Sequence, residues 1–174
     1  MKLRAVLGDL AAREADAIGR VVLVRRRRVL ADELGLLAAA GPAAADAFDE
    51  LLALARAGGG GAGLVAGQAV STTAGDLPAR WLVHVAVPRY LPQRQDEFRL
   101  AAAYRAVLEV ADGLGARTLA LTPFGLTLPY WPLDTATRVA LSTLRNTPCR
   151  VREATLVVRT TGALDVLAEA LARR

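Results

Sequence analysis

The 174-residue sequence contains little of the side-chain chemistry on which many enzymes depend. It has a single cysteine, Cys149, so it can form neither a disulfide bond within the chain nor a cysteine metal cluster. It has a single histidine, His84, and no carboxylate stands at ligand spacing from either residue. The composition therefore argues against most metalloenzymes, and we expect no metal site and no resident cofactor.

Long hydrophobic runs are missing as well. No apolar stretch approaches the about 20 residues that cross a bilayer, and the first apolar segment ends at Asp9, too early for a signal peptide. We therefore expect a cytoplasmic protein that does not contact a membrane. Hydrophobic residues make up 53% of the chain and charged residues 22%, which is typical of a globular protein, and the length predicts one domain over residues 1–174.

Lysine is almost absent: Lys2 is the only one, so the other 21 of the 22 basic residues are arginine. Ile18 is likewise the only isoleucine. Both biases fit a codon preference, and the formal net charge of +5 is therefore weak evidence for an anionic partner. The basic residues are concentrated at one place, the run from Arg25 to Arg28.

The order of apolar and amphipathic segments predicts an α/β fold. Strands are expected at residues 3–7, 16–24, 68–73, 81–87, 117–121 and 151–158, and helices at 30–40, 43–57, 95–114, 133–144 and 163–173. Gly41-Pro42 separates the first two helices. The alternation predicts a three-layer α/β/α fold with a mixed central sheet of about six strands. Ligands of such sheets bind beyond the carboxyl ends of strands. The loops to inspect follow Leu7, Val24, Val87 and Leu121.

Five short strings in this order resemble those of the macro domain, the ADP-ribose-binding (Appr-1''-p processing-like) family. In chain order they are Gly8-Asp9-Leu10, Asp16-Ala17-Ile18, Ala40-Gly41-Pro42, Gly67-Gln68-Ala69-Val70-Ser71-Thr72 and Trp81-Leu82-Val83-His84-Val85-Ala86-Val87-Pro88. Each string by itself is weak evidence for the resemblance. Together the strings cover almost the whole chain, and because of their order and spacing the chain resembles a divergent member of the family.

The resemblance implies a nucleotide ligand, ADP-ribose or a related molecule, at Asp9. In the family, the aspartate of this turn holds the adenine amino group, whose N–H donates to the carboxylate. The backbone N–H of Leu10 would face the ring. Asp9 is explained equally well as the N-cap of a short helix that starts near Ala11, and both interpretations stay open.

Other parts of the family's site are altered. Where hydrolysing members have two asparagines that orient the distal ribose, this chain has Arg20-Val21-Val22-Leu23, so we lean against enzymatic activity. If the chain is active, the resemblance implies an ADP-ribosyl hydrolase.

The family's second glycine-rich phosphate loop, aligned on Pro132, reads Leu126-Thr127-Leu128-Pro129-Tyr130-Trp131 in this chain, and only Gly125 lies nearby. Glycines let a backbone approach phosphate closely, and Pro129 has no N–H to donate. The family's first glycine-rich phosphate loop, counted back from Gly41, falls near Val29-Leu30-Ala31, which contains no glycine, so both phosphate loops are degenerate.

Arginine can replace backbone N–H groups because its guanidinium binds phosphate with two hydrogen bonds. The run Arg25 to Arg28 could act in this way, but a solvated loop or a charged edge strand is slightly favoured. Tyr130 and Trp131 could stack on a base or fill an empty cleft, and filling is slightly favoured. The candidate ligand-binding residues are Asp9, Leu10, Arg20, Arg25, Arg26, Gly125, Leu126, Thr127, Leu128, Tyr130 and Trp131.

No residue is predicted to be catalytic, because His84 within an apolar strand is typical of a packed, hydrogen-bonded core histidine. The sequence favours a module that binds ADP-ribose or a related nucleotide without efficient hydrolysis. The alternatives are a ligand-free scaffold for oligomerisation or partner docking, a weak ADP-ribose hydrolase, and a domain that binds RNA or an ADP-ribosylated protein through Arg25 to Arg28.

Overall fold

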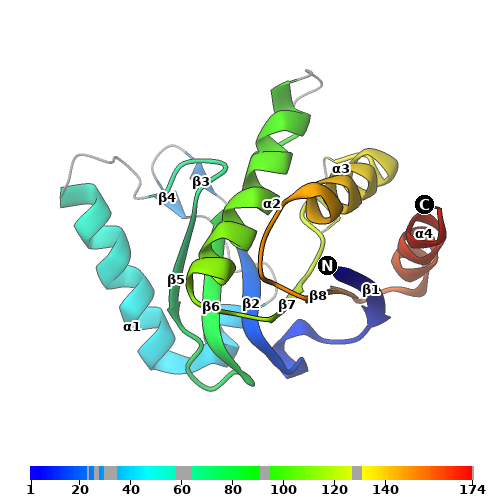
Figure 1. Cartoon of the computed structure of the whole chain (residues 1–174). Coiled ribbons are helices and arrows are strands. Elements are labelled where there is room, and N and C mark those ends of the chain that lie inside the picture. The colour runs from blue at the N-terminus through cyan, green and yellow to red at the C-terminus, as the bar shows by residue number, and fades with distance from the viewer. Residues whose placement is uncertain are drawn as a thin grey trace.

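The computed structural model describes residues 1–22, 24–25, 28–29, 35–57, 64–90, 95–126 and 131–173. Its centre is a mixed six-stranded sheet in the order β1-β8-β7-β2-β6-β5 (Figure 1). The strands are β1 (Lys2–Leu7), β2 (Ala15–Val22), β5 (Ala69–Thr73), β6 (Ala79–Ala86), β7 (Thr118–Leu121) and β8 (Glu153–Val158). All neighbouring pairs are parallel except β5 and β6. The predicted α/β class and six-stranded mixed sheet are confirmed.

Helices cover both faces of this sheet, as the alternating pattern predicts. They are α1 (Leu36–Ala57), α2 (Gln95–Gly113), α3 (Leu133–Asn146) and α4 (Thr161–Ala172), with a short 3-10 helix, η1 (Leu10–Ala12). Helix α1 buries Phe48 and Leu52 against one face. The other three helices share one large apolar core with the opposite face, in which Tyr104 and Leu167 are fully buried. The sheet and the helices packed on its two faces form the three layers.

Several predicted boundaries are wrong. The second strand ends at Val22, and β3 (Val24–Arg25) pairs antiparallel with β4 (Arg28–Val29) in a separate two-stranded sheet. The break expected between the helices at 30–40 and 43–57 is confirmed: α1 consists of two helical parts that meet at non-helical backbone at Gly41, and residues 30–34 lie outside the described residues. The kink is at Gly41, with φ 79° and ψ 179°, next to Pro42, which has no N–H to continue the helical ladder.

The strand directions place the candidate site. Because β1, β8, β7, β2 and β6 are parallel, their carboxyl ends lie on one edge of the sheet, and the loops after them gather there. We call this the carboxyl edge. None of the helices in the described part of the chain is long and apolar enough to cross a membrane.

Candidate functional site

Asp9 lies at the carboxyl edge, directly after β1 and Gly8. Its backbone is extended, and its Oδ1 accepts a hydrogen bond of 3.1 Å from the N–H of Ala11. Asp9 is therefore the N-cap of η1, as one of the two interpretations predicts. Its Oδ2 accepts no hydrogen bond from any described residue. The cap thus leaves one carboxylate oxygen for another donor. The side chain of the next residue, Leu10, is buried in the apolar core.

Arg159 is a second charged residue at this place, and sequence reasoning missed it. It follows β8 directly, and its Nη2 lies 3.5 Å from Oδ1 of Asp9, with side chains 57% and 55% exposed. The two residues meet because Leu7 pairs with Val158 at the ends of β1 and β8. The signal that could have found Arg159 is its place as the first residue after a strand, but using it requires knowing which strands are neighbours.

Arg20, a predicted ligand contact, points into the protein. Its side chain is only 2% exposed. Its Nη1 lies 2.8 Å from Nδ1 of His84, and its guanidinium carbon lies 5.0 Å from the centre of the Phe48 ring. The structure therefore directs these groups toward the interior between β2, β6 and α1, and a direct contact between Arg20 and a ligand stays a prediction.

His84 is a hydrogen-bonded core histidine, as predicted. An arginine can only donate, so Nδ1 of His84 must accept from Arg20, and the ring proton must sit on Nε2. Nε2 then donates to Oγ1 of Thr72 at 2.8 Å, and that hydroxyl donates to the carbonyl of Thr73 at 2.9 Å. Burial, with the positive charge of Arg20 adding to it, lowers the pKa of His84 to about 3. With both ring nitrogens engaged, His84 is not a general base.

The loop after β7 is held by a buried tyrosine. Tyr104 of α2 accepts the N–H of Phe124 at 2.7 Å, and the two rings stack with centroids 4.3 Å apart. Burial raises the pKa of Tyr104, so its hydroxyl stays neutral. Farther along, Leu126 donates its N–H to the carbonyl of Pro123 at 3.2 Å. Gly125 between them is buried with φ 92°. Residues 123–126 of this loop are thus held by contacts within the protein.

Trp131 packs between two loops of the carboxyl edge. It is 7% exposed, and its Nε1 donates to the carbonyl of Pro88 at 3.2 Å. Its ring lies 5.0 Å from that of Tyr90 and also covers Gly125. Trp131 is therefore packed against the protein, as expected of a residue that fills space. Of the other candidates, Arg26, Thr127, Leu128 and Tyr130 lie outside the described residues, as does the side chain of Arg25.

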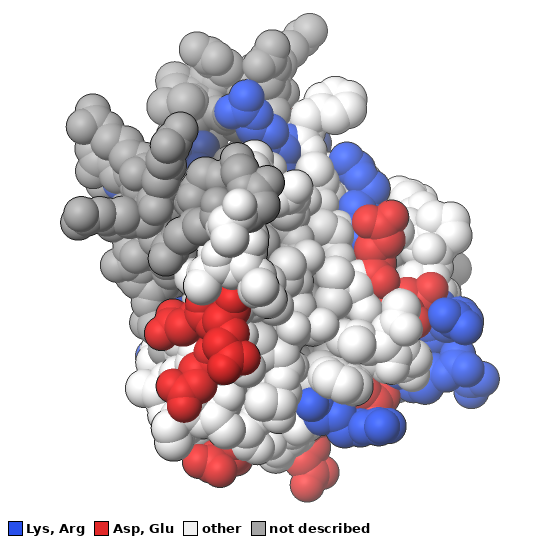
Figure 2. Space-filling model, turned by 90° about the vertical axis from the view of Figure 1, so that its left-hand side faces the viewer, with Lys and Arg blue, Asp and Glu red and all other residues white. Residues whose placement is uncertain are grey.

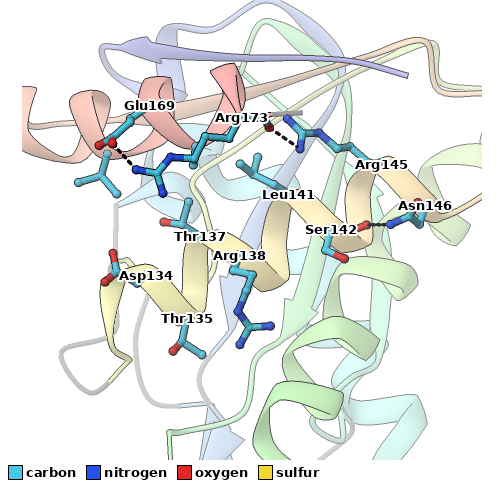
Figure 3. A pocket seen from close by; sticks show the side chains of 12 residues that line it. Asp134, Thr135, Thr137, Arg138, Leu141, Ser142, Arg145, Asn146, Glu169 and Arg173 are labelled. Carbon is cyan, nitrogen blue, oxygen red and sulfur yellow. Dashed lines mark hydrogen bonds and ion pairs between the residues drawn. The ribbon is translucent and has the colours of Figure 1, made fainter.

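A hollow of about 650 Å³ lies between α3 and α4, away from Asp9 (Figure 3). Its arginines are engaged with protein groups: Arg145 donates to the carbonyls of Leu171 and Arg173, and Arg173 pairs with Glu169. We therefore do not place the function here. In the described part of the chain, no group of three histidine, cysteine or acidic residues could hold a metal ion.

The surface charge is not uniformly basic. On the side of the molecule that carries α1, acidic side chains form a group apart from the basic ones (Figure 2). The exposed acidic residues of α1 are Asp46, Asp49 and Glu50. A broad nucleic-acid interface over this helix is therefore disfavoured by charge.

Comparison with known proteins gives one consistent result. A family model described as "Macro domain" matches residues 34–140. A macro domain-containing protein of Streptomyces nogalater is 41% identical over 111 residues, which cover 64% of this chain and 61% of that protein. One of Streptomyces coelicolor is 40% identical over 116 residues, which cover 67% of this chain and 69% of that protein. The match thus spans only about two thirds of the relatives' length.

Solved structures agree on the fold. A macrodomain of Oceanobacillus iheyensis with ADP superposes with a TM-score of 0.81 at 20% identity and covers 98% of this chain and 90% of that one. A macrodomain of Trypanosoma brucei in complex with ADP-ribose gives a TM-score of 0.72 at 20% identity and covers 98% and 69%. These comparisons identify the same ADP-ribose-binding family that the five sequence strings resemble. This chain belongs to the macro domain family.

Proposed function

We propose that this chain binds ADP-ribose or a related adenine nucleotide at the carboxyl edge of its sheet and does not hydrolyse it efficiently. The observation that carries the proposal is the position of Asp9, whose Oδ2 is left open by the cap at the end of β1. Structural neighbours that hold ADP or ADP-ribose support the same class of ligand.

The chemistry around Asp9 suits an adenine base. The exocyclic amino group donates hydrogen bonds, and an ionised carboxylate accepts them. Arg159 adds donors within 3.5 Å of Asp9, and the ring nitrogens of adenine are acceptors. A carboxylate and a guanidinium side by side thus match the donor and acceptor on one edge of the base.

The absence of efficient hydrolysis is proposed from the residues that could assist a water molecule. The only histidine, His84, is buried with both ring nitrogens engaged. The only asparagine, Asn146, ends α3 at the opposite edge of the sheet and donates to the carbonyl of Ser142. The one histidine and the one asparagine of the chain are thus both engaged in contacts within the protein.

Calorimetric titration with ADP-ribose tests the proposal, with two substitutions that separate the roles of Asp9. Asp9→Ser keeps an N-cap but removes the carboxylate, so it should weaken binding about tenfold or more while the melting temperature hardly changes. Asp9→Ala should lose binding and also about 1 kcal/mol of stability. Asp49→Ala, an exposed position on α1, is the matched control and should bind like the wild type. Absence of heat at millimolar ligand refutes the proposal.

A second assay addresses hydrolysis. The protein is incubated at high concentration with an ADP-ribosylated protein, and free ADP-ribose is measured over time. Release above the uncatalysed rate, abolished by Asp9→Ser, would overturn the non-hydrolytic part of the proposal and leave the binding part intact.

A ligand-free scaffold for oligomerisation or docking is the second candidate. The burial of Trp131 between Pro88 and Gly125 favours it, because a packed indole occupies space beside the two loops. Silent titrations together with a stable dimer in light scattering would support this function. Binding of RNA or an ADP-ribosylated protein through Arg25 to Arg28 is also a proposal, and for RNA it predicts affinity that falls steeply with salt.

A further inference from the structure

The hollow between α3 and α4 is lined by groups that the proposed function does not use (Figure 3). Its volume of about 650 Å³ lies within the range of small-molecule sites, about 300–1,000 Å³. Part of its wall is apolar and comes from both helices, with Leu141 of α3 and Val166 and Ala170 of α4. The hollow therefore offers a surface against which an aliphatic molecule can pack.

Thr137 of α3 is a buried polar residue of this hollow. Its side chain points from α3 toward α4, into the space between the two helices (Figure 3). The residue is only 3% exposed, and its hydroxyl has no hydrogen-bond partner in the described part of the chain. Buried polar groups without a partner are rare in native proteins. This hydroxyl therefore points to a partner that is supplied from outside the chain.

A threonine in a helix can satisfy its hydroxyl internally, by donating to the carbonyl of the residue three or four positions earlier. Thr147, directly after α3, does so, because its hydroxyl donates to the carbonyl of Thr143 at 2.7 Å. Among the described residues, Thr137 makes no such hydrogen bond. Its hydroxyl is thus available to a molecule in the hollow.

Asp134 places a negative charge beside this hydroxyl. It stands three positions before Thr137, so the two side chains share one face of α3, and both line the hollow. Arg138, four positions after Asp134, is placed to pair with it, but its Nη2 donates instead to Glu97 of α2 at 2.9 Å. None of the ion pairs between described residues includes Asp134. Its carboxylate is therefore available to a cation.

The other charged groups of the hollow are already engaged within the protein. Arg138 pairs with Glu97, Arg173 pairs with Glu169, and Arg145 donates to two carbonyls at the end of α4. The groups that stay available are a carboxylate, which only accepts hydrogen bonds, and a hydroxyl, which accepts as well as donates. A ligand that satisfies both must donate hydrogen bonds, and the carboxylate favours one with a positive charge.

We propose that the hollow between α3 and α4 binds a small aliphatic amine, whose ammonium group donates hydrogen bonds to the hydroxyl of Thr137 and the carboxylate of Asp134. An ammonium group suits this place because it has three donors and a compact charge. The alkyl chain packs on Leu141, Val166 and Ala170. This inference does not rest on the proposed function, because none of these residues belongs to the candidate nucleotide site.

Calorimetric titration of the whole chain with n-butylamine tests the site. The wild type should release heat at millimolar amine, and the affinity should fall with added salt because Asp134 is exposed. n-Butanol, which lacks the charge, and butyrate, which reverses it, should each bind at least tenfold more weakly. Absence of heat with the amine overturns the proposal, as does butanol or butyrate binding equally well or better.

Thr137→Val tests the buried hydroxyl, because valine keeps the shape of the side chain. The affinity for n-butylamine should fall about tenfold, the usual effect of a lost hydrogen bond to a charged group. Without amine, the variant should melt no lower than the wild type, since it removes a buried polar group that has no partner. Thr143→Val is the matched control, because Thr143 is also buried in α3 but does not line the hollow. It should bind the amine like the wild type.

Asp134→Asn tests the charge at an exposed position, where the substitution does not endanger folding. The affinity for n-butylamine should fall tenfold or more. Asp165→Asn is the matched control, because Asp165 is exposed on α4 and does not line the hollow. Amine binding that neither Asp134→Asn nor Thr137→Val weakens would place the amine elsewhere and overturn the proposal. So would equal losses in the variants and their controls.

Discussion

Arg20 of β2 donates a hydrogen bond of 2.8 Å to Nδ1 of His84 on the neighbouring strand β6, and both side chains are buried. Phe48 of α1 covers the pair, with its ring stacked 4.1 Å from the imidazole and 5.0 Å from the guanidinium carbon. The geometry requires a neutral imidazole, because a second proton on Nδ1 would place a donor against a donor. Protonation of His84 therefore opposes folding.

The stability of the protein should fall as the pH is lowered from about 6.5. Unfolded His84 takes up a proton near pH 6.5, whereas the folded residue, with its pKa lowered to about 3, does not. Over this interval the unfolded state binds more protons, so each pH unit costs at most about 1.4 kcal/mol. Urea unfolding at pH 7, 6 and 5 measures the slope.

His84→Gln is the control for this slope. A glutamine carbonyl can still accept from Arg20 but does not titrate, so the variant should be less stable overall and nearly independent of pH between 7 and 5. Equal slopes in the two proteins would show that the pKa of His84 is not lowered. Imidazole ¹⁵N shifts provide a direct check, with the proton expected on Nε2.

Asp16, at the start of β2, should stabilise the fold through its carboxylate. Its Oδ2 accepts the N–H of Arg117 at 2.8 Å, and both the N–H and the hydroxyl of Thr118 at 2.9 and 3.0 Å. The backbone hydrogen bond from Arg117, the largest effect, holds the pKa of Asp16 below its usual value of 3.8. Asp16→Asn should therefore cost about 1–2 kcal/mol at pH 7.

The pH dependence of this substitution identifies the carboxylate as the cause. A lowered pKa stabilises the folded state above the unfolded pKa, and this stability is lost as the pH falls through the folded pKa. The difference between wild type and Asp16→Asn should thus shrink below pH 4. Asp46→Asn, at an exposed position on α1, should cost less than about 0.5 kcal/mol at any pH. A constant difference down to pH 2 would contradict the prediction.

The fold was predictable because strands and helices carry their own apolar patterns. The residues at which the strands end were not predictable, as β2 illustrates. Residues 21–24 are four apolar residues in a row, and nothing in them indicates that pairing with β6 ends at Val22 and that a separate two-stranded sheet begins at Val24. Burial on both faces removes the alternation that would mark such a change.

The site was only partly predictable. Asp9 could be found because its turn is local, whereas its neighbour Arg159 depends on the pairing of β1 with β8 across most of the chain. The burial of Arg20 could not be predicted in this way. Side chains two apart on a strand share a face, but Ala17 and Val21 on one face of β2 are buried as well as Ile18 and Val22 on the other. Alternation therefore does not indicate whether Arg20 points inward or toward solvent.

Two glycines with positive φ allow a test of how tightly the loop after β7 is packed. Gly115, at the end of α2, has φ 75°, and a Cβ there would meet nothing within 4 Å. Gly115→Ala should therefore cost only the backbone strain, about 1 kcal/mol. Gly125→Ala carries the same kind of strain at φ 92° and in addition a Cβ 3.0 Å from Trp131, so it should cost about 2–3 kcal/mol.

The excess cost of Gly125→Ala should come with a displaced indole. Urea unfolding measures the two costs, and tryptophan fluorescence in a Trp81→Phe background should shift to longer wavelength for Gly125→Ala but not for Gly115→Ala, because only the first pushes Trp131 from its packed position. Gly113→Ala, with no contact and no positive φ, should be neutral or slightly stabilising. Equal costs at positions 115 and 125 would mean that Trp131 moves freely beside Gly125 and that the loop is not tightly packed there.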